Sequence, residues 1–409
     1  MTSTACVPLA EIGKTPSKSS TPDPSRFPLD QWYVAGFSSE LTDKPIARTF
    51  LGQKVVLFRT GDGVVAALED RCCHRSLPLS CGTVENAGVR CGYHGMLYAP
   101  SGQCIEIPGQ ERIPSKAKVK AYNVMEQNQI VWIWMPLVDG AEPKSLPPQY
   151  PHHDDPRYKF GSGNYHYNAP WQLIHDNLLD LSHLGYVHLQ TIGGNARLHM
   201  NAEMKVTSEG DHVKVVRFMP GSAPPPTYKA AWPFGEKIDR WQEIEFHLSH
   251  LRIWTGAVEP GTDAIDDPSR GGFHMRGFHG VTPETDETAH YFWSMASNKH
   301  PDMPENIDAV VQQTAFTFDE DRAVIEAQYQ TCWSSATGLH GRISMSTSVR
   351  TGRDASSPSC CSNPTNRQKA GFQSALPVWM RVIPLEKFNR WRQNDGYKQR
   401  CCLRIAGQS

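Results

Sequence analysis

Two short segments of the chain each pair one cysteine with one histidine. The first contains Cys72 and His74, and the second, after sixteen intervening residues, contains Cys91 and His94. A 2Fe-2S cluster of the Rieske type needs this donor set, because one iron takes two thiolates and the other takes two imidazoles. Structural zinc uses the same residue types, but its common spacing places the cysteines together and then the histidines. The spacing therefore favours the iron-sulfur cluster.

A second pattern follows about a hundred residues later, where Asp180, His183 and His188 lie close together in sequence. Two histidines with a nearby acid suit an open non-haem Fe(II) site. Asp180 and His183 share one helix face, whereas His188 would point away unless the helix breaks near Gly185. A third protein ligand is required, and composition does not choose among the acids of one later segment. Those acids are Asp319, Glu320, Asp321 and Glu326.

Together the two patterns describe a protein that receives electrons at one iron centre and delivers them to dioxygen at another. The chain has no strand-linked Gly-x-Gly-x-x-Gly dinucleotide fingerprint, so NADH would be oxidised by another protein. Two other classes stay open: a Rieske electron carrier without oxygenase chemistry, and a zinc-stabilised binding module. The presence of His183 and His188 argues against both, because neither class would use them.

Composition bounds the rest of the function. Lysine plus arginine (41) nearly cancels aspartate plus glutamate (42), which gives no electrostatic case for a nucleic-acid or membrane partner. The longest apolar run, Ile130 to Val138, contains Pro136 and is far shorter than the roughly 20 residues of a bilayer span. The segment Met1 to Phe27 lacks the apolar core of a secretory signal. Eleven cysteines make a poor disulfide framework, so a cytoplasmic location is expected.

The length of 409 residues predicts two domains. Short β-branched and aromatic runs separated by turn residues indicate an N-terminal β domain over residues 28–140, after a flexible segment 1–27. An α+β domain is expected over 141–342, with helical patterns at Trp171 to His188 and Asp308 to Tyr329. Residues 343–409 lack helical periodicity and are expected to form an atypical, poorly ordered tail. The strands expected from the alternation are 32–35, 54–59, 64–69, 129–134, 213–218, 243–248 and 290–297.

The two Cys/His pairs, the run Asp176 to His183 and the later Glu320-Asp321-Arg322 resemble the catalytic α subunits of Rieske non-haem iron aromatic ring-hydroxylating oxygenases. The resemblance covers roughly residues 28–330 and is strongest to the branch that acts on phthalate, vanillate, dicamba and phenoxybenzoate. It implies an all-β Rieske domain followed by an α+β catalytic domain with an antiparallel sheet and long helices, in a helix-grip, START-like arrangement.

The resemblance also implies roles for individual residues. Cys72, His74, Cys91 and His94 match the cluster ligands. The family's facial triad on mononuclear iron corresponds to His183, His188 and Asp321.

Asp180 matches an acid that links His183 to the partner's His94 across a subunit boundary, and Asn177 matches a residue beside the mononuclear iron. His279 resembles a substrate-contacting histidine, and Arg276 is expected to join it in orienting a carboxylate. An ordinary pair on the surface of a strand is the other interpretation of His279 and Arg276.

The implied activity is that of a terminal oxygenase component, which uses O2 and NADH-derived electrons on an aromatic carboxylate. A flavin and iron-sulfur reductase would supply the electrons, and the assembly would be a homotrimer in which each cluster serves the next chain. The favoured reaction is angular dioxygenation with cleavage of a diaryl ether, as in phenoxybenzoate-type enzymes. The alternative is O-demethylation by a vanillate- or dicamba-type monooxygenase. Pocket shape, encoded between about residues 200 and 320, must decide between them.

Overall fold

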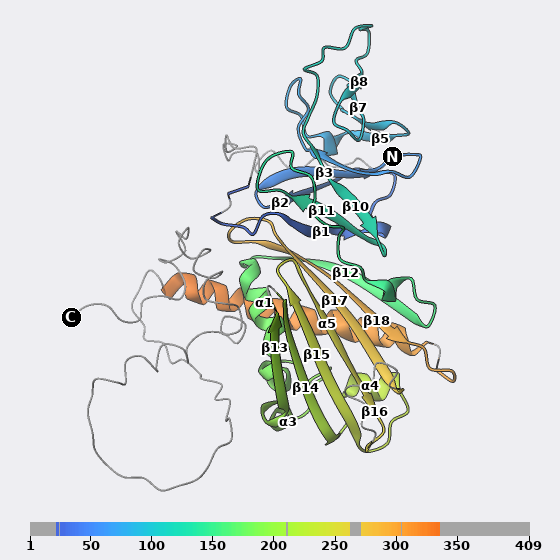
Figure 1. Cartoon of the computed structure of the whole chain (residues 1–409), viewed down its shortest axis with the longest axis vertical. Helices are drawn as coiled ribbons and strands as arrows, with labels where there is room; N and C mark the ends of the chain where they lie inside the picture. Colours follow the sequence, from blue (N-terminus) through green and yellow to red (C-terminus); the bar gives the residue numbers. More distant parts are fainter. Residues whose placement is uncertain (1–21, 24, 210–211, 262–270, 304, 336–409) are drawn as a thin grey trace, which may run out of the picture.

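The structure is a computed structural model that describes residues 22–23, 25–209, 212–261, 271–303 and 305–335. Three small sheets form the N-terminal part, and one large sheet with helices forms the rest (Figure 1). Most of the predicted N-terminal segment and the whole of the predicted tail lie outside the described residues. Within the described part, no helix combines the length and the apolar character that crossing a membrane requires.

The N-terminal part is β structure, as predicted, apart from short 3₁₀ turns, and its named strands pair antiparallel. A three-stranded sheet has the order β1-β11-β10, and two four-stranded sheets have the orders β2-β3-β4-β9 and β5-β6-β7-β8. The strands are β1 (Gln31–Phe37), β2 (Ile46–Phe50), β3 (Gln53–Arg59), β4 (Val65–Glu69), β5 (Thr83–Glu85), β6 (Gly88–Arg90), β7 (Leu97–Tyr98), β8 (Cys104–Glu106), β9 (Ala121–Tyr122), β10 (Val124–Gln127) and β11 (Ile130–Met135).

A seven-stranded antiparallel sheet dominates the second part, in the order β12-β18-β17-β16-β15-β14-β13. One long helix, α5, lies along one face of this sheet, which is the helix-grip arrangement (Figure 1). The strands are β12 (Tyr158–Tyr167), β13 (Glu203–Glu209), β14 (His212–Ser222), β15 (Ile238–His247), β16 (His250–Val258), β17 (Phe273–Pro283) and β18 (Ala289–Asn298). The α-helices are α1 (Trp171–Leu179), α2 (Leu184–Val187), α3 (Ala196–Asn201), α4 (Pro226–Ala231) and α5 (Asn306–Ser335). Short 3₁₀ helices occupy Ser38–Glu40, Leu79–Cys81, Pro151–His153 and Leu181–His183.

Helix α5 packs on the sheet through a stripe of residues three or four positions apart. Its buried members include Ile307, Val310, Phe318 and Ile325, the spacing of one helix face. The edge strand β12 approaches this helix closely, because a Cβ at Gly161 would lie only 2.5 Å from the side chain of Val311. Glycine therefore lets the edge of the sheet close against α5.

Among the described residues, one helix is long: α5, with 30 residues, which contains the helical pattern expected at Asp308 to Tyr329. The predicted helix from Trp171 to His188 is interrupted, but at Asp180 rather than near Gly185. Asp180 has extended dihedrals (φ −100°, ψ 92°), and its side chain accepts a hydrogen bond from the Ser182 N–H. It therefore ends α1 and caps the following 3₁₀ turn.

The two parts of the chain pack against each other through β1 and β17. Thr282 Oγ1 donates to the Val34 carbonyl (2.7 Å), and a shared cluster of buried aromatic side chains includes Trp132 and Phe278. The β5–β8 sheet, next to the predicted cluster residues in sequence, lies at the far end of the N-terminal part, away from the large sheet (Figure 1). This packing fixes the distance between the two candidate metal sites within one chain.

Candidate metal centres and the cavity beside them

The first candidate centre is built on two loops of matching geometry, Cys72–Leu77 and Cys91–Met96. In each loop the cysteine N–H donates to the carbonyl five residues later, at 2.8 Å in both cases. The fourth residue after each cysteine has a left-handed backbone, with φ 57° at Ser76 and 73° at Gly95. These two turns bring the predicted cluster residues to one end of the β5–β8 sheet.

The four predicted cluster residues divide into a buried and an exposed pair. Cys72 and Cys91 are buried, whereas His74 and His94 are exposed, with ring centroids 4.5 Å apart. Burial raises the pKa of the Cys91 thiol, while backbone N–H groups of the same loop donate to its sulfur and act in the opposite direction. Tyr98 adds a hydroxyl 3.2 Å from Cys72 Sγ. Two buried sulfurs with hydrogen-bond donors close by and two exposed imidazoles fit a 2Fe-2S cluster whose histidine-bound iron lies near solvent.

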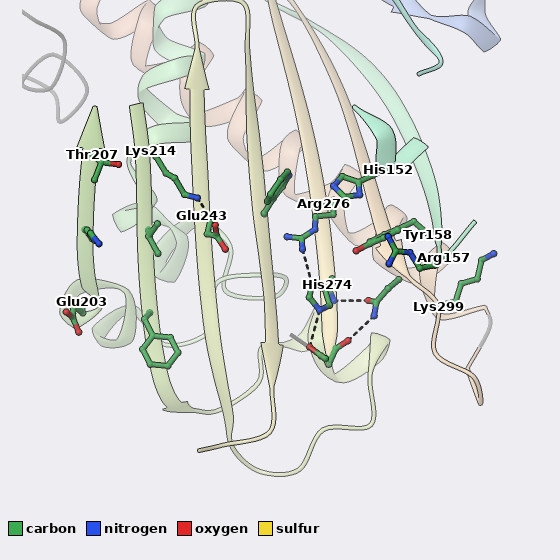
Figure 2. A pocket seen from close by; sticks show the side chains of 17 residues that line it. His152, Arg157, Tyr158, Glu203, Thr207, Lys214, Glu243, His274, Arg276 and Lys299 are labelled. Carbon is green, nitrogen blue, oxygen red and sulfur yellow. Dashed lines mark hydrogen bonds and ion pairs between the residues drawn. The ribbon is translucent and has the colours of Figure 1, made fainter. Parts of the chain in front are cut away.

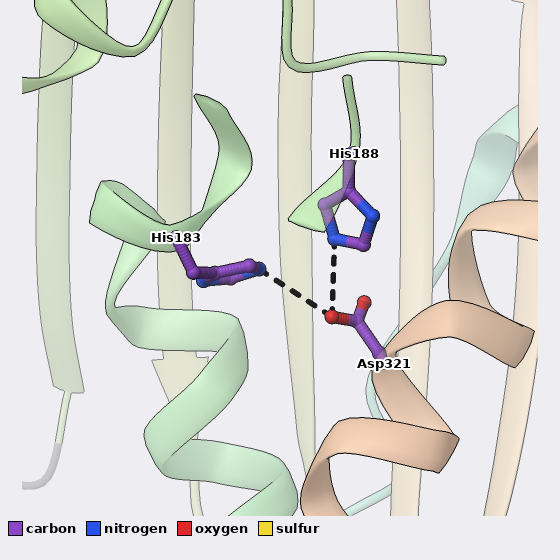
Figure 3. A group of neighbouring side chains, drawn as sticks. All are labelled: His183, His188 and Asp321. Atoms are coloured by element: carbon purple, nitrogen blue, oxygen red, sulfur yellow. Dashed lines mark ion pairs between the residues drawn. The ribbon is translucent and has the colours of Figure 1, made fainter. Parts of the chain in front are cut away.

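The second candidate centre brings together His183, His188 and Asp321 (Figure 3). One donor atom from each residue lies within 4.8 Å of the others. Asp321 Oδ1 is 3.4 Å from His183 Nε2 and 3.0 Å from His188 Nε2. His188 Nε2 is buried and has no hydrogen bond of acceptable geometry within the described residues. Two imidazoles and one carboxylate on one side of a point are the donor set of an open non-haem iron site.

The other ring nitrogen of each histidine is held by an oxygen that accepts a hydrogen bond. His183 Nδ1 lies 2.6 Å from the Asp180 carbonyl oxygen, and His188 Nδ1 lies 2.8 Å from Glu320 Oε2. Because these oxygens accept, each Nδ1 atom carries a proton and each Nε2 atom faces Asp321, where a proton or a metal ion must lie between the ring nitrogen and the carboxylate. The Nε2 atoms are therefore ready to bind a metal.

Asp321 is ionised at neutral pH although it is only 5% exposed. Burial alone would raise its pKa, but the two adjacent imidazoles outweigh that effect and lower the pKa to about 2. Asn177 Nδ2 donates to the same Oδ1 atom at 3.0 Å. Asn177 thus contacts Asp321 and orients its carboxylate.

The predicted contact between the Asp180 carboxylate and His183 is wrong within this chain. His183 contacts the backbone carbonyl of Asp180, while the exposed carboxylate accepts from the Ser182 N–H at 3.0 Å. The extended conformation at Asp180 turns its carbonyl toward the imidazole and its side chain toward solvent.

A narrow cavity, the inner cavity, begins at the second centre and lies between α5 and the sheet. It encloses about 60 Å³, and its wall is mainly apolar. Met275 and Met295 belong to this wall, and thioether side chains adapt readily to an occupant. His279 also lines it and is 2% exposed; its Nδ1 is 2.7 Å from Tyr291 Oη, while Nε2 has no partner within the described residues. Burial lowers the pKa of His279 to about 3, so the ring is neutral.

The prediction that Arg276 works beside His279 is wrong. The two residues lie three positions apart on β17, so their side chains point to opposite faces of the sheet. Arg276 lines a separate cavity, the outer cavity, on the face away from α5 (Figure 2). An odd spacing along a strand excludes joint contact with one ligand.

Sequence reasoning missed Arg240, which lines the inner cavity and is 1% exposed. Its Nη2 donates to the Ile192 carbonyl (3.0 Å), whereas Nε and Nη1 have no partner among the described residues. The signal was present in the alternation of β15, because Arg240 and Gln242 occupy the same parity as the core residues Ile244 and Phe246. An arginine at a core-facing position of a strand, where an apolar residue is usual, indicates a binding site for an anion.

Comparison with known proteins agrees with these two centres. Residues 31–123 match the Rieske 2Fe-2S domain, and residues 167–349 match the vanillate O-demethylase oxygenase C-terminal domain. The toluene-4-sulfonate monooxygenase system iron-sulfur subunit of Comamonas testosteroni is 39% identical over 303 residues, covering 72% of this chain and 86% of that protein.

Two further relatives extend the match. The vanillate O-demethylase oxygenase subunit of Pseudomonas sp. (strain HR199 / DSM 7063) is 34% identical over 314 residues, covering 74% of this chain and 86% of that protein. The crystal structure of dicamba monooxygenase bound to dicamba superimposes with a TM-score of 0.69 at 31% identity, covering 78% of this chain and 92% of that one. The chain therefore belongs to the Rieske non-haem iron oxygenases, enzymes with a 2Fe-2S cluster and mononuclear iron, in the branch of vanillate O-demethylase and dicamba monooxygenase.

Proposed function

We propose that this oxygenase component removes a methyl group from a methoxylated aromatic acid by monooxygenation. The observation that carries the proposal is the inner cavity. The candidate metal triad and the buried Arg240, two of whose guanidinium nitrogens lack hydrogen-bond partners among the described residues, line the same apolar space. The relatives that are O-demethylases favour this reaction over the angular dioxygenation expected from the sequence. Residues 28–140 would form the Rieske domain and 141–342 the catalytic domain.

The metal ligands follow from the donor sets. Cys72 and Cys91 would bind one iron of the cluster, and His74 and His94 the other. The mononuclear iron would take His183 Nε2, His188 Nε2 and a carboxylate oxygen of Asp321, with the remaining positions open on the cavity side. Asn177 and Glu320 would hold Asp321 and His188 in place through the hydrogen bonds described above.

Arg240 would bind the acidic group of the substrate. Its two unpaired guanidinium N–H groups can donate to two oxygens of one carboxylate or sulfonate. His279 Nε2 offers a further polar contact on the β17 side of the same cavity. An anion held at Arg240 would fix which carbon of the aromatic ring carries its substituent toward the triad.

When bound, the iron supplies oxygen binding and activation, and the cluster supplies the electrons. Overall, one aryl methyl ether, O2, two electrons and two protons would give a phenol, formaldehyde and water. The protein's part is to orient the methoxy carbon and to exclude bulk water with apolar side chains such as Leu178, Ile253 and Phe318. Excluding water keeps the electrostatic contacts of Arg240 and Asp321 strong.

Electrons would come from an NADH-dependent flavin and iron-sulfur reductase and would cross between chains of a homotrimer. The position of the β5–β8 sheet, at the end of the molecule remote from the triad, supports transfer between chains rather than within one (Figure 1). The exposed carboxylate of Asp180 is free to reach the partner's His94. Asp180 would then connect the two centres by its side chain on one side and its carbonyl on the other.

A product analysis tests the proposed reaction. Purified oxygenase with a reductase and NADH would be given methoxybenzoates, toluene-4-sulfonate and phenoxybenzoates under ¹⁸O2. We expect a phenol and formaldehyde from a methoxybenzoate, with one formaldehyde per O2 consumed. Ether cleavage of a phenoxybenzoate to two phenolic products, without demethylation, would refute the proposal. Hydroxylation of the toluenesulfonate methyl group is the second candidate, favoured by the 39% identity to a toluene-4-sulfonate monooxygenase subunit.

A further inference from the structure

The outer cavity contains a buried cation that lacks an anionic partner. Arg276 is 6% exposed, and its Nε and Nη1 atoms have no hydrogen-bond partner among the described residues. Its Nη2 contacts His274 Nδ1 at 3.1 Å, which satisfies one donor without supplying a charge. A desolvated guanidinium without a carboxylate is costly to a protein, since burial penalises an unpaired charge by several kcal/mol.

The wall beside Arg276 is aromatic. The guanidinium carbon lies 4.7 Å from the centre of the Trp254 ring, and His152 packs edge-on against Trp254 with centroids 5.6 Å apart. The ring centroids of Tyr158 and His152 lie 5.0 Å apart. Trp254 Nε1 and His152 Nδ1 also lack partners within the described residues. Burial, helped by Arg276, lowers the pKa of His152 to about 4, so this ring adds polar atoms without charge at neutral pH.

The charges around the cavity favour an anion. Five cationic side chains line it against two acids, Glu203 and Glu243. Lys214 is paired with Glu243 at 3.1 Å and Arg157 with Asp155 at 2.6 Å, which leaves three cations, Arg276 among them, against Glu203 in the lining. The cations come from several elements of the outer face. Lys205 lies on β13, and Lys299, which directly follows β18, is labelled in Figure 2. The cavity encloses about 1030 Å³, which accommodates a small molecule with room for water.

We propose that the outer cavity is a second binding site for an aromatic carboxylate, separate from the inner cavity. Arg276 would donate to the carboxylate, and Trp254 with His152 would pack against the ring. Because Arg276 and His279 point to opposite faces of β17, a ligand here would be separated from the mononuclear iron by the thickness of the sheet. This site would bind without turning over its ligand.

Fluorine NMR with 4-fluorobenzoate tests the site on the full-length enzyme loaded with iron. We expect two bound resonances: one strongly broadened by the paramagnetic mononuclear iron, from the inner cavity, and one much sharper, from the outer cavity. Arg276→Gln should weaken binding at the sharper resonance at least about tenfold and leave the broadened one in place. Acetate, which lacks the ring, should compete poorly for this site.

The control is Arg252→Gln, which removes another arginine of the outer face that does not line the cavity. It should leave both resonances unchanged. Arg276→Lys keeps the charge and should retain part of the affinity if Arg276→Gln does not fold. A wild-type enzyme without the sharper resonance, or an Arg276→Gln enzyme that keeps it at full affinity, would overturn the proposal. Loss of only the broadened resonance would count against the inner cavity and not against this site.

Discussion

Polar side chains that lie beside the mononuclear centre occupy positions where packing normally requires apolar residues. Asp321 continues the buried stripe of α5, and Arg240 and Gln242 continue the core parity of β15. Burying such groups without partners costs free energy of folding. Their burial is therefore explained most simply by ligands that complete them, a metal at Asp321 and an anion at Arg240.

Arg240→Gln should reduce kcat/KM for an anionic substrate by about 10- to 100-fold, since a charge-assisted hydrogen bond contributes roughly 1.5–3 kcal/mol. The loss should appear mainly in KM, because the contact would be made equally in the bound substrate and the transition state. Steady-state kinetics with a methoxybenzoate and with its neutral methyl ester measure the effect. An equal loss on the ester would assign Arg240 to structure rather than to binding.

His183→Ala should remove the mononuclear iron and leave the cluster intact. Iron analysis should fall from about three to about two atoms per chain, with the visible absorption of the cluster retained. Cys91→Ala should give the opposite pattern, with loss of the cluster absorption. If His183→Ala bleached the cluster instead, the ligands would be wrongly assigned between the two centres.

For individual residues, the sequence predicted the types of metal-binding side chains better than the contacts between side chains. Spacing pointed to the Cys/His pairs, because metal ligation restricts both residue type and spacing, whereas His183 and His188 became candidate ligands only in the context of those pairs and of the resemblance. The choice of Asp321 came from resemblance, although helix periodicity would have selected it: Asp321 falls on the stripe of Val310, Phe318 and Ile325, and Asp319 does not. The pairing of Arg276 with His279 failed because residues near in sequence were placed together without regard to strand parity.

The elements that carry the two histidines are short, and their positions depend on close packing. Helix α2 is only four residues long and contacts α3 through Gly185, where a Cβ would lie 2.2 Å from the Ala196 Cα atom. A helix this short has little stability of its own. Its orientation, and with it that of His183 and His188, is therefore set by the approach of α3.

Gly185→Ala should force α2 and α3 apart and destabilise the protein by about 1–3 kcal/mol, the usual range for overpacking. Because both iron histidines flank α2, the variant should also bind the mononuclear iron more weakly. Thermal unfolding and iron content measure the two effects.

Gly235→Ala is the matched control, since nothing lies within 4 Å of a Cβ at that position. It should unfold at the wild-type temperature. An unchanged Gly185→Ala protein would mean that α2 and α3 can separate without cost.

Alternation predicted three of the seven strands of the large sheet, β14, β15 and β18, and helical periodicity predicted the helix α5; β12, β13, β16 and β17 were missed. In β12 the glycines Gly161 and Gly163 interrupt the β-branched pattern for a reason that lies in tertiary packing against α5 and Trp293. The sequence analysis placed the break of the first helix at Gly185, whereas the helix ends at Asp180. Gly185 instead allows α2 to pack closely against Ala196. A glycine can serve close approach rather than chain reversal, and only the fold distinguishes the two.

In the whole molecule, the β5–β8 sheet with its cluster loops lies at one end, whereas helix α5, which carries Asp321, lies against the large sheet, well away from that end (Figure 1). Sequence could not predict this separation, because it depends on how β1 packs against β17. A cyclic assembly would place the cluster of one chain beside the triad of the next. The proposed trimer would then be required for turnover.

Mixing two inactive variants tests transfer between chains. Cys91→Ala chains keep the mononuclear site and His183→Ala chains keep the cluster, so each homotrimer should be inactive. After subunit exchange of equal amounts, activity should recover to about a quarter of wild type, because half of the chains can react and half of their neighbours can donate. No recovery, despite mixed trimers shown by native mass spectrometry, would indicate transfer within one chain.

The two methionines of the inner cavity have a consequence for enzyme lifetime. Met275 and Met295 carry readily oxidised thioethers and line the same cavity as the proposed oxygen-activating metal. Whenever oxygen is reduced with no substrate in place, a thioether of this cavity can be oxidised in its stead, giving methionine sulfoxide. The enzyme should therefore lose activity fastest when it is incubated with reductant and oxygen but without substrate. Peptide mapping should then find sulfoxide at Met275 or Met295.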